Sequence, residues 1–158
     1  MSPAERSSAG GNVGVVILVV EDEAVVAIVL EFALGLAGHE VLGPVGGEGE
    51  ALRLAAERRP ELALVDIRLS RGGSAVRLAR ALKERWAVPS LFLSGQTGQA
   101  RAAGDVALGL IGKPYDPGEV VDAVAAVGEL LAGRRPALMP RRLELLPGWW
   151  GWESRAGR

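Results

Sequence analysis

The sequence predicts a single α/β domain built on an open, mostly parallel β-sheet with helices on both faces. Strand-like and helix-like segments alternate five times along the chain, and the connections between them are short. The segment 13–20 is apolar on both faces, as expected for a central parallel strand that helices cover from each side. The predicted fold class is therefore doubly wound, with five strands.

Each element has its own local signal. The strands are runs of β-branched and other apolar residues, expected at 13–20, 41–45, 62–67, 90–93 and 108–111. The helices are expected at 23–37, 50–59, 74–85, 97–104 and 117–131. Gly38 ends the first helix, Pro60 stops the second, and Pro117 occupies the first turn of the last. The helix at 97–104 is expected to be short and weak.

The length and composition indicate one folded unit with extensions. The chain has 158 residues, of which 49% are hydrophobic and 23% charged, enough for a single core. Residues 1–12 are small, polar and glycine-rich, which predicts a disordered leader. The domain is expected over 13–133. Residues 134–158 read as a tail, basic at first and then rich in tryptophan, that is too short for a second domain.

The overall charge and residue usage exclude several classes of protein. The formal net charge is −1, so nothing points to nucleic acid or to an anionic membrane surface. There are no cysteines, which removes disulfides, thiolate metal sites and thiol nucleophiles. No apolar run reaches the roughly 18 to 20 residues needed to span a bilayer, and no secretory signal is recognisable. We expect a cytoplasmic protein.

Polar side chains follow four of the predicted strands, where each strand ends. Glu21 and Asp22 close the first strand, Asp66 lies near the end of the third, Ser94 follows the fourth and Lys113 follows the fifth. In open parallel sheets, ligands bind at the carboxyl ends of the strands. These side chains are therefore expected to converge on one binding site.

The acids of this group are expected to attract a divalent cation. Carboxylates about 4 Å apart repel by up to about 4 kcal/mol per pair at an effective dielectric near 20. Protons or a cation must relieve that repulsion. Because the site offers oxygen donors and the chain has no thiols and one histidine, Mg²⁺ is the natural choice.

In these residues the chain resembles the receiver domain of two-component response regulators, over about 13–131. The resemblance rests on the acid pair, on Asp66 in LALVDIRL, on Ser94 in LFLSG and on the Lys113-Pro114 pair, which occur in the family's order. The stretch PSLFLSG, a short fourth helix and KPY also look like single-domain receivers of alphaproteobacteria. The resemblance implies a flavodoxin-like (CheY-like) sheet with strand order 2-1-3-4-5.

The resemblance also implies roles for the residues at the strand ends. Asp66 would accept a phosphoryl group from a histidine kinase or a histidine phosphotransfer protein. Asp22 and Asp66 would bind Mg²⁺ directly, Glu21 would act mainly through water, and the backbone carbonyl of Arg68 would add an oxygen. In that case the chain catalyses only its own phosphorylation and dephosphorylation, and is not otherwise an enzyme.

Further expectations concern the phosphoryl group. Lys113 and Ser94 would contact phosphoryl oxygens, and the bond before Pro114 is often cis in the family. Arg68 and Gln96 lie where side chains shield an acyl phosphate from water, so we expect them to tune its hydrolysis. Many receivers carry an aromatic residue three positions before the lysine, and its rotation reports phosphorylation. That position is Leu110 here, so an aromatic switch of this kind is not expected.

The output and some alternatives remain open. The downstream protein is unknown, and a homodimer could form through the first helix or through the face of the fourth and fifth helices. The first helix is apolar nearly all round, so the tryptophan-rich tail or a second subunit is expected to cover it, unless the tail is disordered. The alternatives are an adaptor that is never phosphorylated, a Mg²⁺-dependent aspartyl-phosphate phosphotransferase, and a flavin or nucleotide binder, against which the acidic first loop argues.

Overall fold

The computed structural model describes residues 14–69 and 73–149, so the leader expected at 1–12 lies outside the described residues. The strands are β1 (Val16–Val20), β2 (Glu40–Val45), β3 (Leu62–Asp66), β4 (Ser90–Ser94), β5 (Gly109–Gly112) and β6 (Leu143–Leu145). The helices are α2 (Ala24–Leu36), α3 (Glu48–Glu57), α4 (Ala75–Trp86), α5 (Thr97–Ala102) and α6 (Pro117–Leu131). The expected helix at 97–104 is indeed short.

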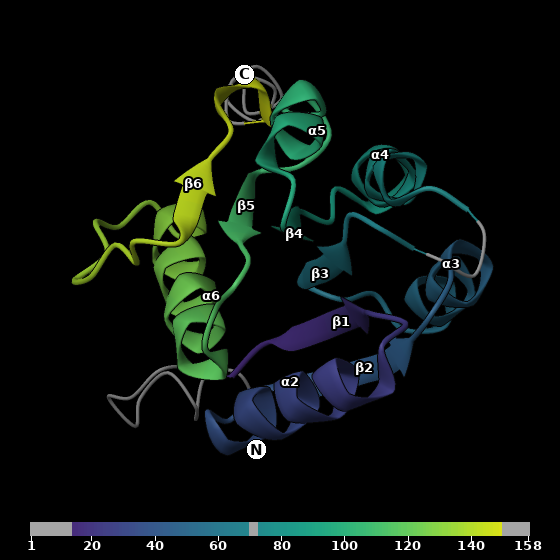
Figure 1. Ribbon diagram of the computed structural model, residues 1–158, viewed down its shortest axis with the longest axis horizontal. Helices are drawn as coiled ribbons and strands as arrows, with labels where there is room; N and C mark the ends of the chain where they lie inside the picture. The colour runs from purple at the N-terminus through teal and green to yellow at the C-terminus, as the bar shows by residue number, and fades with distance from the viewer. Residues whose placement is uncertain (1–13, 70–72, 150–158) are drawn as a thin grey trace.

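The strands form one sheet in the order β2-β1-β3-β4-β5-β6 (Figure 1). The first five strands are parallel and confirm the predicted order. The predicted number of strands was wrong, because β6 pairs antiparallel with β5 at the edge of the sheet. This sixth strand comes from the segment that the sequence assigned to a tail, where a three-residue strand leaves too little periodicity to be recognised.

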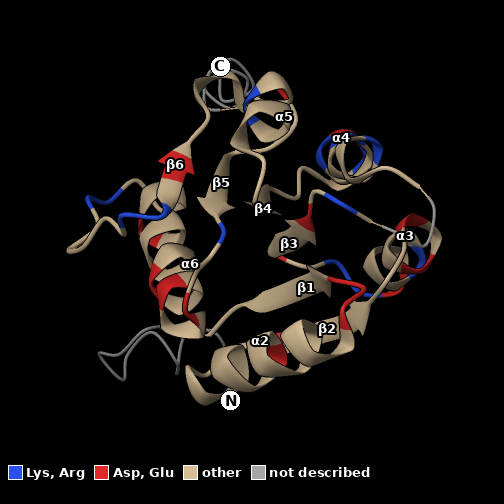
Figure 2. Ribbon diagram, in the orientation of Figure 1, with Lys and Arg blue, Asp and Glu red and all other residues tan. Residues whose placement is uncertain are grey.

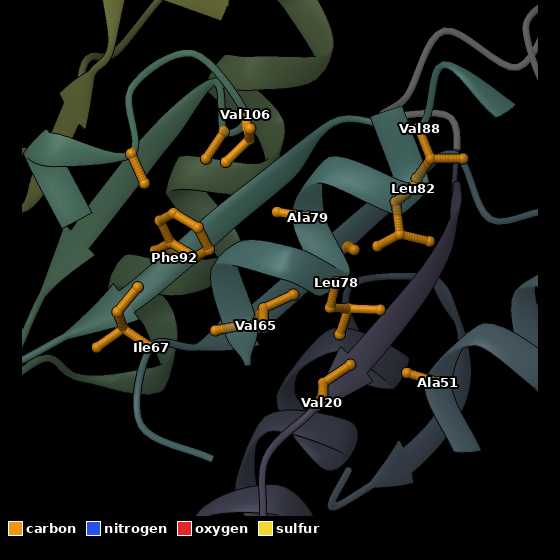
Figure 3. Close-up of a cluster of buried hydrophobic side chains, with 14 of the residues drawn as sticks. Val20, Ala51, Val65, Ile67, Leu78, Ala79, Leu82, Val88, Phe92 and Val106 are labelled. Atoms are coloured by element: carbon orange, nitrogen blue, oxygen red, sulfur yellow. The ribbon is translucent and has the colours of Figure 1, made fainter. Parts of the chain in front are cut away.

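Side chains alternate between the two faces of the sheet and build two cores. On β1, Leu18 and Val20 face the core under α3, α4 and α5, whereas Ile17 and Val19 face the core under α2 and α6. All four are fully buried. Figure 3 shows part of the first core, in which side chains of the central strands meet those of α4: Val20, Val65, Phe92, Leu78, Ala79 and Leu82.

Local signals set the helix boundaries. At the start of α4 the Ser74 hydroxyl accepts a hydrogen bond from the Arg77 amide at 3.1 Å, which satisfies one of the free N–H groups of the first turn. The same helix ends at Ala87, which has a left-handed φ of 55°. Gly38, with a φ of 94°, follows α2 as predicted.

The segment after α6 is an integral part of the domain. Leu143, Leu146 and Trp149 are buried, and the exposed fraction of Trp149 is only 1%. The Nζ atom of Lys83 lies 5.2 Å from the centroid of the Trp149 ring. The described part of this segment is therefore ordered, which for these residues rules out the disordered tail that the sequence left open as one alternative; residues 150–158 lie outside the described residues.

The outer face of α2 is apolar and exposed. Its large exposed side chains are Val25, Ile28, Val29, Phe32 and Leu36, with exposed fractions from 42% to 75%. In Figure 2 the helix is drawn without basic residues, and its sequence carries a single acid, Glu31. Residues 143–149 join β5 and the cores of the sheet, so this part of the tail does not cover the α2 face, which contradicts the first of the two expectations; cover by a second subunit stays a prediction. No helix within 14–69 or 73–149 is long and apolar enough to cross a membrane.

Candidate functional site

Three carboxylates meet at the carboxyl ends of β1 and β3. Ligand oxygens of Glu21, Asp22 and Asp66 all lie within 4.8 Å of one another. Glu21 and Asp66 are 3% and 4% exposed, whereas Asp22 is half-buried. The acids predicted from the sequence are thus brought together, and two of them are almost removed from solvent.

The register of the parallel sheet explains this convergence. Val20 pairs with Val65, and Asp66 pairs with Leu93, so β1, β3 and β4 end at nearly the same level. Residues that directly follow or close these strands then lie at one edge of the sheet.

Asp66 is held by two donors that leave it at the centre of the site. Its Oδ1 accepts a hydrogen bond from the backbone N–H of Arg68 at 2.9 Å. Its Oδ2 lies 3.2 Å from the Nζ of Lys113, which reaches it from the end of β5. The carboxylate is therefore fixed in orientation, and one cation offsets part of the negative charge.

Ser94 lies beside this ion pair at the end of β4 and is fully buried. Its hydroxyl accepts a hydrogen bond from the Gln96 amide at 3.0 Å, and its carbonyl accepts one from the Lys113 amide at 2.8 Å. The peptide bond between Lys113 and Pro114, the candidate from the sequence, is cis. Ser94 thus joins the segments that begin α5 and end β5.

The site opens to solvent through a cavity of about 550 Å³. Residues from four strand ends line it: Asp22, Glu23, Asp66, Arg68, Gly95, Gln96 and Lys113. Arg68 and Gln96, the two residues expected to tune hydrolysis, are both in this lining. A group of the size of a phosphate can enter and reach the Asp66 carboxylate.

The crowding of acids shifts a proton equilibrium. Burial, together with the neighbouring Asp66 carboxylate, raises the pKa of Glu21 from 4.5 to about 8. Its Oε2 accepts a weak hydrogen bond from the Glu23 amide at 3.3 Å, whereas its Oε1 is buried without a hydrogen-bond partner. Without a cation, Glu21 therefore holds a proton at neutral pH.

This donor set fits Mg²⁺. The carboxylate oxygens are hard donors, they lie close enough to share one ion, and the buried Oε1 of Glu21, which has no hydrogen-bond partner, could contact the ion once the carboxyl loses its proton. The half-buried Asp22 and the open cavity leave room for water to complete a coordination shell. The acids Glu21, Asp22 and Asp66 are the groups that would hold the ion.

One residue near the acids was missed by sequence reasoning. The Tyr115 hydroxyl is buried and has no hydrogen-bond partner. Burial raises the pKa of Tyr115, and the negative charges of Glu21, Asp66 and Glu23 raise it further. The sequence showed Tyr115 two positions after Lys113, but the direction in which its ring turns depends on tertiary packing.

Comparison with known proteins agrees with this geometry. A sequence model of the response regulator receiver domain matches residues 17–125, about two thirds of the chain. The chain belongs to the response regulator receiver family. The match begins in β1, ends in α6 and therefore contains every strand end that contributes to the site.

Curated relatives of this receiver are longer proteins. The phyllosphere-induced regulator PhyR of Methylorubrum extorquens is 34% identical over 110 residues, which cover 66% of this chain and 40% of PhyR. The phosphate regulon regulatory protein PhoB of Pseudomonas aeruginosa is 32% identical over 121 residues, which cover 73% of this chain and 52% of PhoB. The receiver thus spans about two fifths to one half of the length of these relatives.

Solved structures show the same fold. The receiver domain of a modulated diguanylate cyclase from Desulfovibrio desulfuricans G20 is 30% identical, has a TM-score of 0.63, and the match covers 70% of this chain and 90% of that chain. A two-component response regulator of the LuxR family from Aurantimonas sp. SI85-9A1 is 25% identical with a TM-score of 0.63, covering 90% and 99% of the two chains.

The raised pKa of Glu21 predicts how stability depends on pH in the metal-free receiver. The pKa is higher in the folded than in the unfolded chain, so the folded state binds more protons between about pH 5 and about pH 8. The free energy of unfolding should therefore fall as the pH rises through this window. The substitution Glu21→Gln removes the titrating group and should remove this loss.

Urea unfolding in a chelator at several pH values measures the effect, and Mg²⁺ added at the upper end of the window should restore stability to wild type. The exposed Glu31 on α2 provides the control substitution Glu31→Gln, which should leave the slope with pH unchanged. Equal slopes for wild type and Glu21→Gln would contradict the assignment.

Proposed function

We propose that this receiver accepts a phosphoryl group on Asp66 from a phosphohistidine of a kinase or phosphotransfer protein, with Mg²⁺, and signals through protein contacts. The observation that carries the proposal is the position of Asp66. Its carboxylate is buried, lies beside an open cavity, and has Lys113 at 3.2 Å and two further acids within reach of a shared cation. Its catalysis is limited to its own phosphorylation and dephosphorylation.

The chemistry is a displacement at phosphorus. An oxygen of Asp66 forms the new O–P bond while the N–P bond to the donor imidazole breaks, and the electron pair of that bond stays on the imidazole nitrogen. Bound Mg²⁺ supplies charge neutralisation for the three acids and the incoming phosphoryl oxygens. Lys113 moves from Asp66 to a phosphoryl oxygen, and the Ser94 hydroxyl donates a hydrogen bond to another.

The first prediction of this function concerns labelling. Incubation with acetyl phosphate and Mg²⁺ should add one phosphoryl group to the wild type, and Asp66→Asn should abolish the adduct because the nucleophilic oxygen is replaced by an amide. Lys113→Ala should lower the yield by about tenfold or more, since a positive partner of the phosphoryl group is lost. Intact-protein mass spectrometry measures both effects.

A matched control for that experiment is Asp105→Asn, which alters an exposed aspartate between α5 and β5 and should be labelled like the wild type. An adduct that persists in Asp66→Asn would contradict the proposal. It would favour another acceptor, whereas no adduct in any protein would favour an adaptor that is never phosphorylated.

Arg68 and Gln96 give a second prediction, on the lifetime of the acyl phosphate. Both line the cavity above Asp66, where their side chains restrict the approach of water. The double substitution to Ala should raise the rate of acyl phosphate hydrolysis by about tenfold, because it opens the path of water to the phosphorus. The decay of the phosphoryl adduct with time measures the rate. An unaltered rate would contradict the role assigned to Arg68 and Gln96.

The donor must dock beside the cavity, and the exposed apolar surface of α2 is suited to that contact. An open groove of about 540 Å³ lies between the first turns of α2 and the segment after β5, and Val25, Val29, Pro114 and Tyr115 line it. Lys113 and Glu23 also line it, so the groove adjoins the acidic site. We propose that the phosphohistidine-bearing helix of the donor lies here.

The docking proposal predicts a selective loss of transfer. The double substitution Val25→Asp and Val29→Asp alters exposed side chains that line this groove, so labelling by acetyl phosphate should be unchanged. A panel of autophosphorylated histidine kinases is first screened for those that label the wild type. Phosphoryl transfer from these kinases to the double variant should be slower by about tenfold or more. A matched pair on the opposite layer, Arg53→Asp and Glu57→Arg on α3, should have no effect on either donor.

An equal loss with acetyl phosphate and with kinases would instead show damage to the site itself. The alternative of a phosphotransferase acting on small molecules has less support in the described residues. Beyond the acids assigned to the cation and the acceptor, the cavity lining adds one acid, Glu23, and its side chain is exposed.

A further inference from the structure

Residues 134–149, which we call the strap, run back from α6 and close the edge of the sheet (Figure 1). In the strap, β6 pairs with β5 through Gly109, Leu110 and Ile111. Two backbone hydrogen bonds extend the pairing, from Gly112 to the Arg142 carbonyl at 3.1 Å and from Leu146 to the Leu108 carbonyl at 2.9 Å. Without the strap, β5 would be an unpaired edge strand.

Ion pairs join the strap to the helices on both sides of β5. Arg101 on α5 makes two hydrogen bonds of 2.7 Å to the carboxylate oxygens of Glu144. Arg142 lies 3.6 Å from Glu119 on α6. The strap therefore contacts α5, β5 and α6 together, and a segment that competes for this face would have to replace these contacts.

The far end of the strap is held by burial. Trp149 is 1% exposed, and its ring faces the Nζ of Lys83, which donates a hydrogen bond to the Asp105 carbonyl. A Cβ atom on Gly148 would lie 2.7 Å from the Gly104 carbonyl oxygen, so glycine is needed for this close approach. The strap is thus anchored at the end of β5 that lies opposite the acidic site.

The near end of the strap is next to the groups that would contact a phosphoryl group. Gly112, which bonds to the strap, directly precedes Lys113. Ser94 accepts from the Gln96 amide at the start of α5, and α5 carries Arg101. If the Ser94 hydroxyl turns to a phosphoryl oxygen, the Gln96 amide loses its acceptor. The start of the six-residue helix α5 is then less firmly held, and a shift of α5 changes the Arg101–Glu144 contact.

We propose that the strap is a releasable intramolecular ligand of the α5–β5–α6 face, and that phosphorylation of Asp66 loosens it. The freed face then accepts an extended segment of a partner protein whose pattern matches that of the strap, apolar–Glu–apolar–apolar, with the acid on Arg101 and the apolar side chains in the pockets of Leu143 and Leu146. This inference rests on the proposed function for its trigger. It also means that a homodimer through this face requires release of the strap.

Hydrogen exchange of the full chain, read by mass spectrometry, tests the inference. Beryllofluoride with Mg²⁺ stands in for the phosphoryl group, and ¹⁹F NMR on the same sample reports whether it is bound. In the bound state, exchange in the peptide covering 143–149 should rise by about tenfold, whereas peptides from β1 and β3 should not change. Unchanged protection of 143–149 in a sample with bound beryllofluoride would overturn the inference.

Substitutions test the strap without any phosphoryl mimic. Arg101→Ala should raise exchange in 143–149 by about threefold in the resting protein, and Gly148→Ala should raise it further because of the clash with Gly104. The matched controls are Arg58→Ala, which breaks an exposed ion pair with Glu40, and Gly128→Ala, where an added Cβ meets nothing within 4 Å.

The two possible failures are distinguishable. Absence of a bound beryllofluoride signal would overturn the proposed function and the trigger together. The effects of Arg101→Ala and Gly148→Ala on exchange would still show whether these contacts hold the strap on the domain. No effect of either substitution would show that these contacts do not hold the strap, and would overturn the inference even if beryllofluoride binds. A peptide of sequence RRLELLPGW that binds the full chain only in the presence of beryllofluoride would support the freed face directly.

Discussion

The structure depends on the repulsion among carboxylates that the parallel sheet forces together. The strand register places Glu21 and Asp66 at one edge, both almost fully buried, and within the described residues Lys113 forms the ion pair that compensates part of their charge. The raised pKa of Glu21 shows how this conflict is relieved in the absence of a cation, by keeping a proton. In the proposed function the same cluster binds a divalent ion, which would neutralise it and so allow the negative phosphoryl group to approach Asp66.

The two surfaces that flank the site have different characters. The α2 face is apolar and open, and adjoins the cavity where a donor must deliver its phosphoryl group. The α5–β5–α6 face is covered by the chain itself, through β6 and its ion pairs. In the proposed scheme the phosphoryl donor binds on one side of the site and the downstream partner binds on the other. Lys113 directly follows Gly112, which bonds to the strap, and the Ser94 hydroxyl accepts a hydrogen bond from the Gln96 amide at the start of α5, so both residues connect the site with the elements that the strap contacts.

Much of this was predictable because alternating strands and helices with polar strand ends leave a strong local pattern. The helices and the acids came from signals of that kind, whereas the order of the five parallel strands came from the family resemblance; the family match agrees with both. The strap was not predictable, because β6 is three residues long and the burial of Trp149 depends on the distant Lys83 and Asp105. Lys83 stood out in the sequence only as one of two lysines, and nothing local indicated its partner. The burial of the Tyr115 hydroxyl is likewise a tertiary property.

The central claim is that a proton on Glu21 and a cation compete to neutralise the same cluster. Calorimetric titration of Mg²⁺ near neutral pH, in two buffers of different ionisation enthalpy, counts the protons that leave on binding. The account predicts release of about one proton per ion by the wild type and almost none by Glu21→Gln. Binding of Mg²⁺ without proton release by the wild type, or equal release by both proteins, would contradict it.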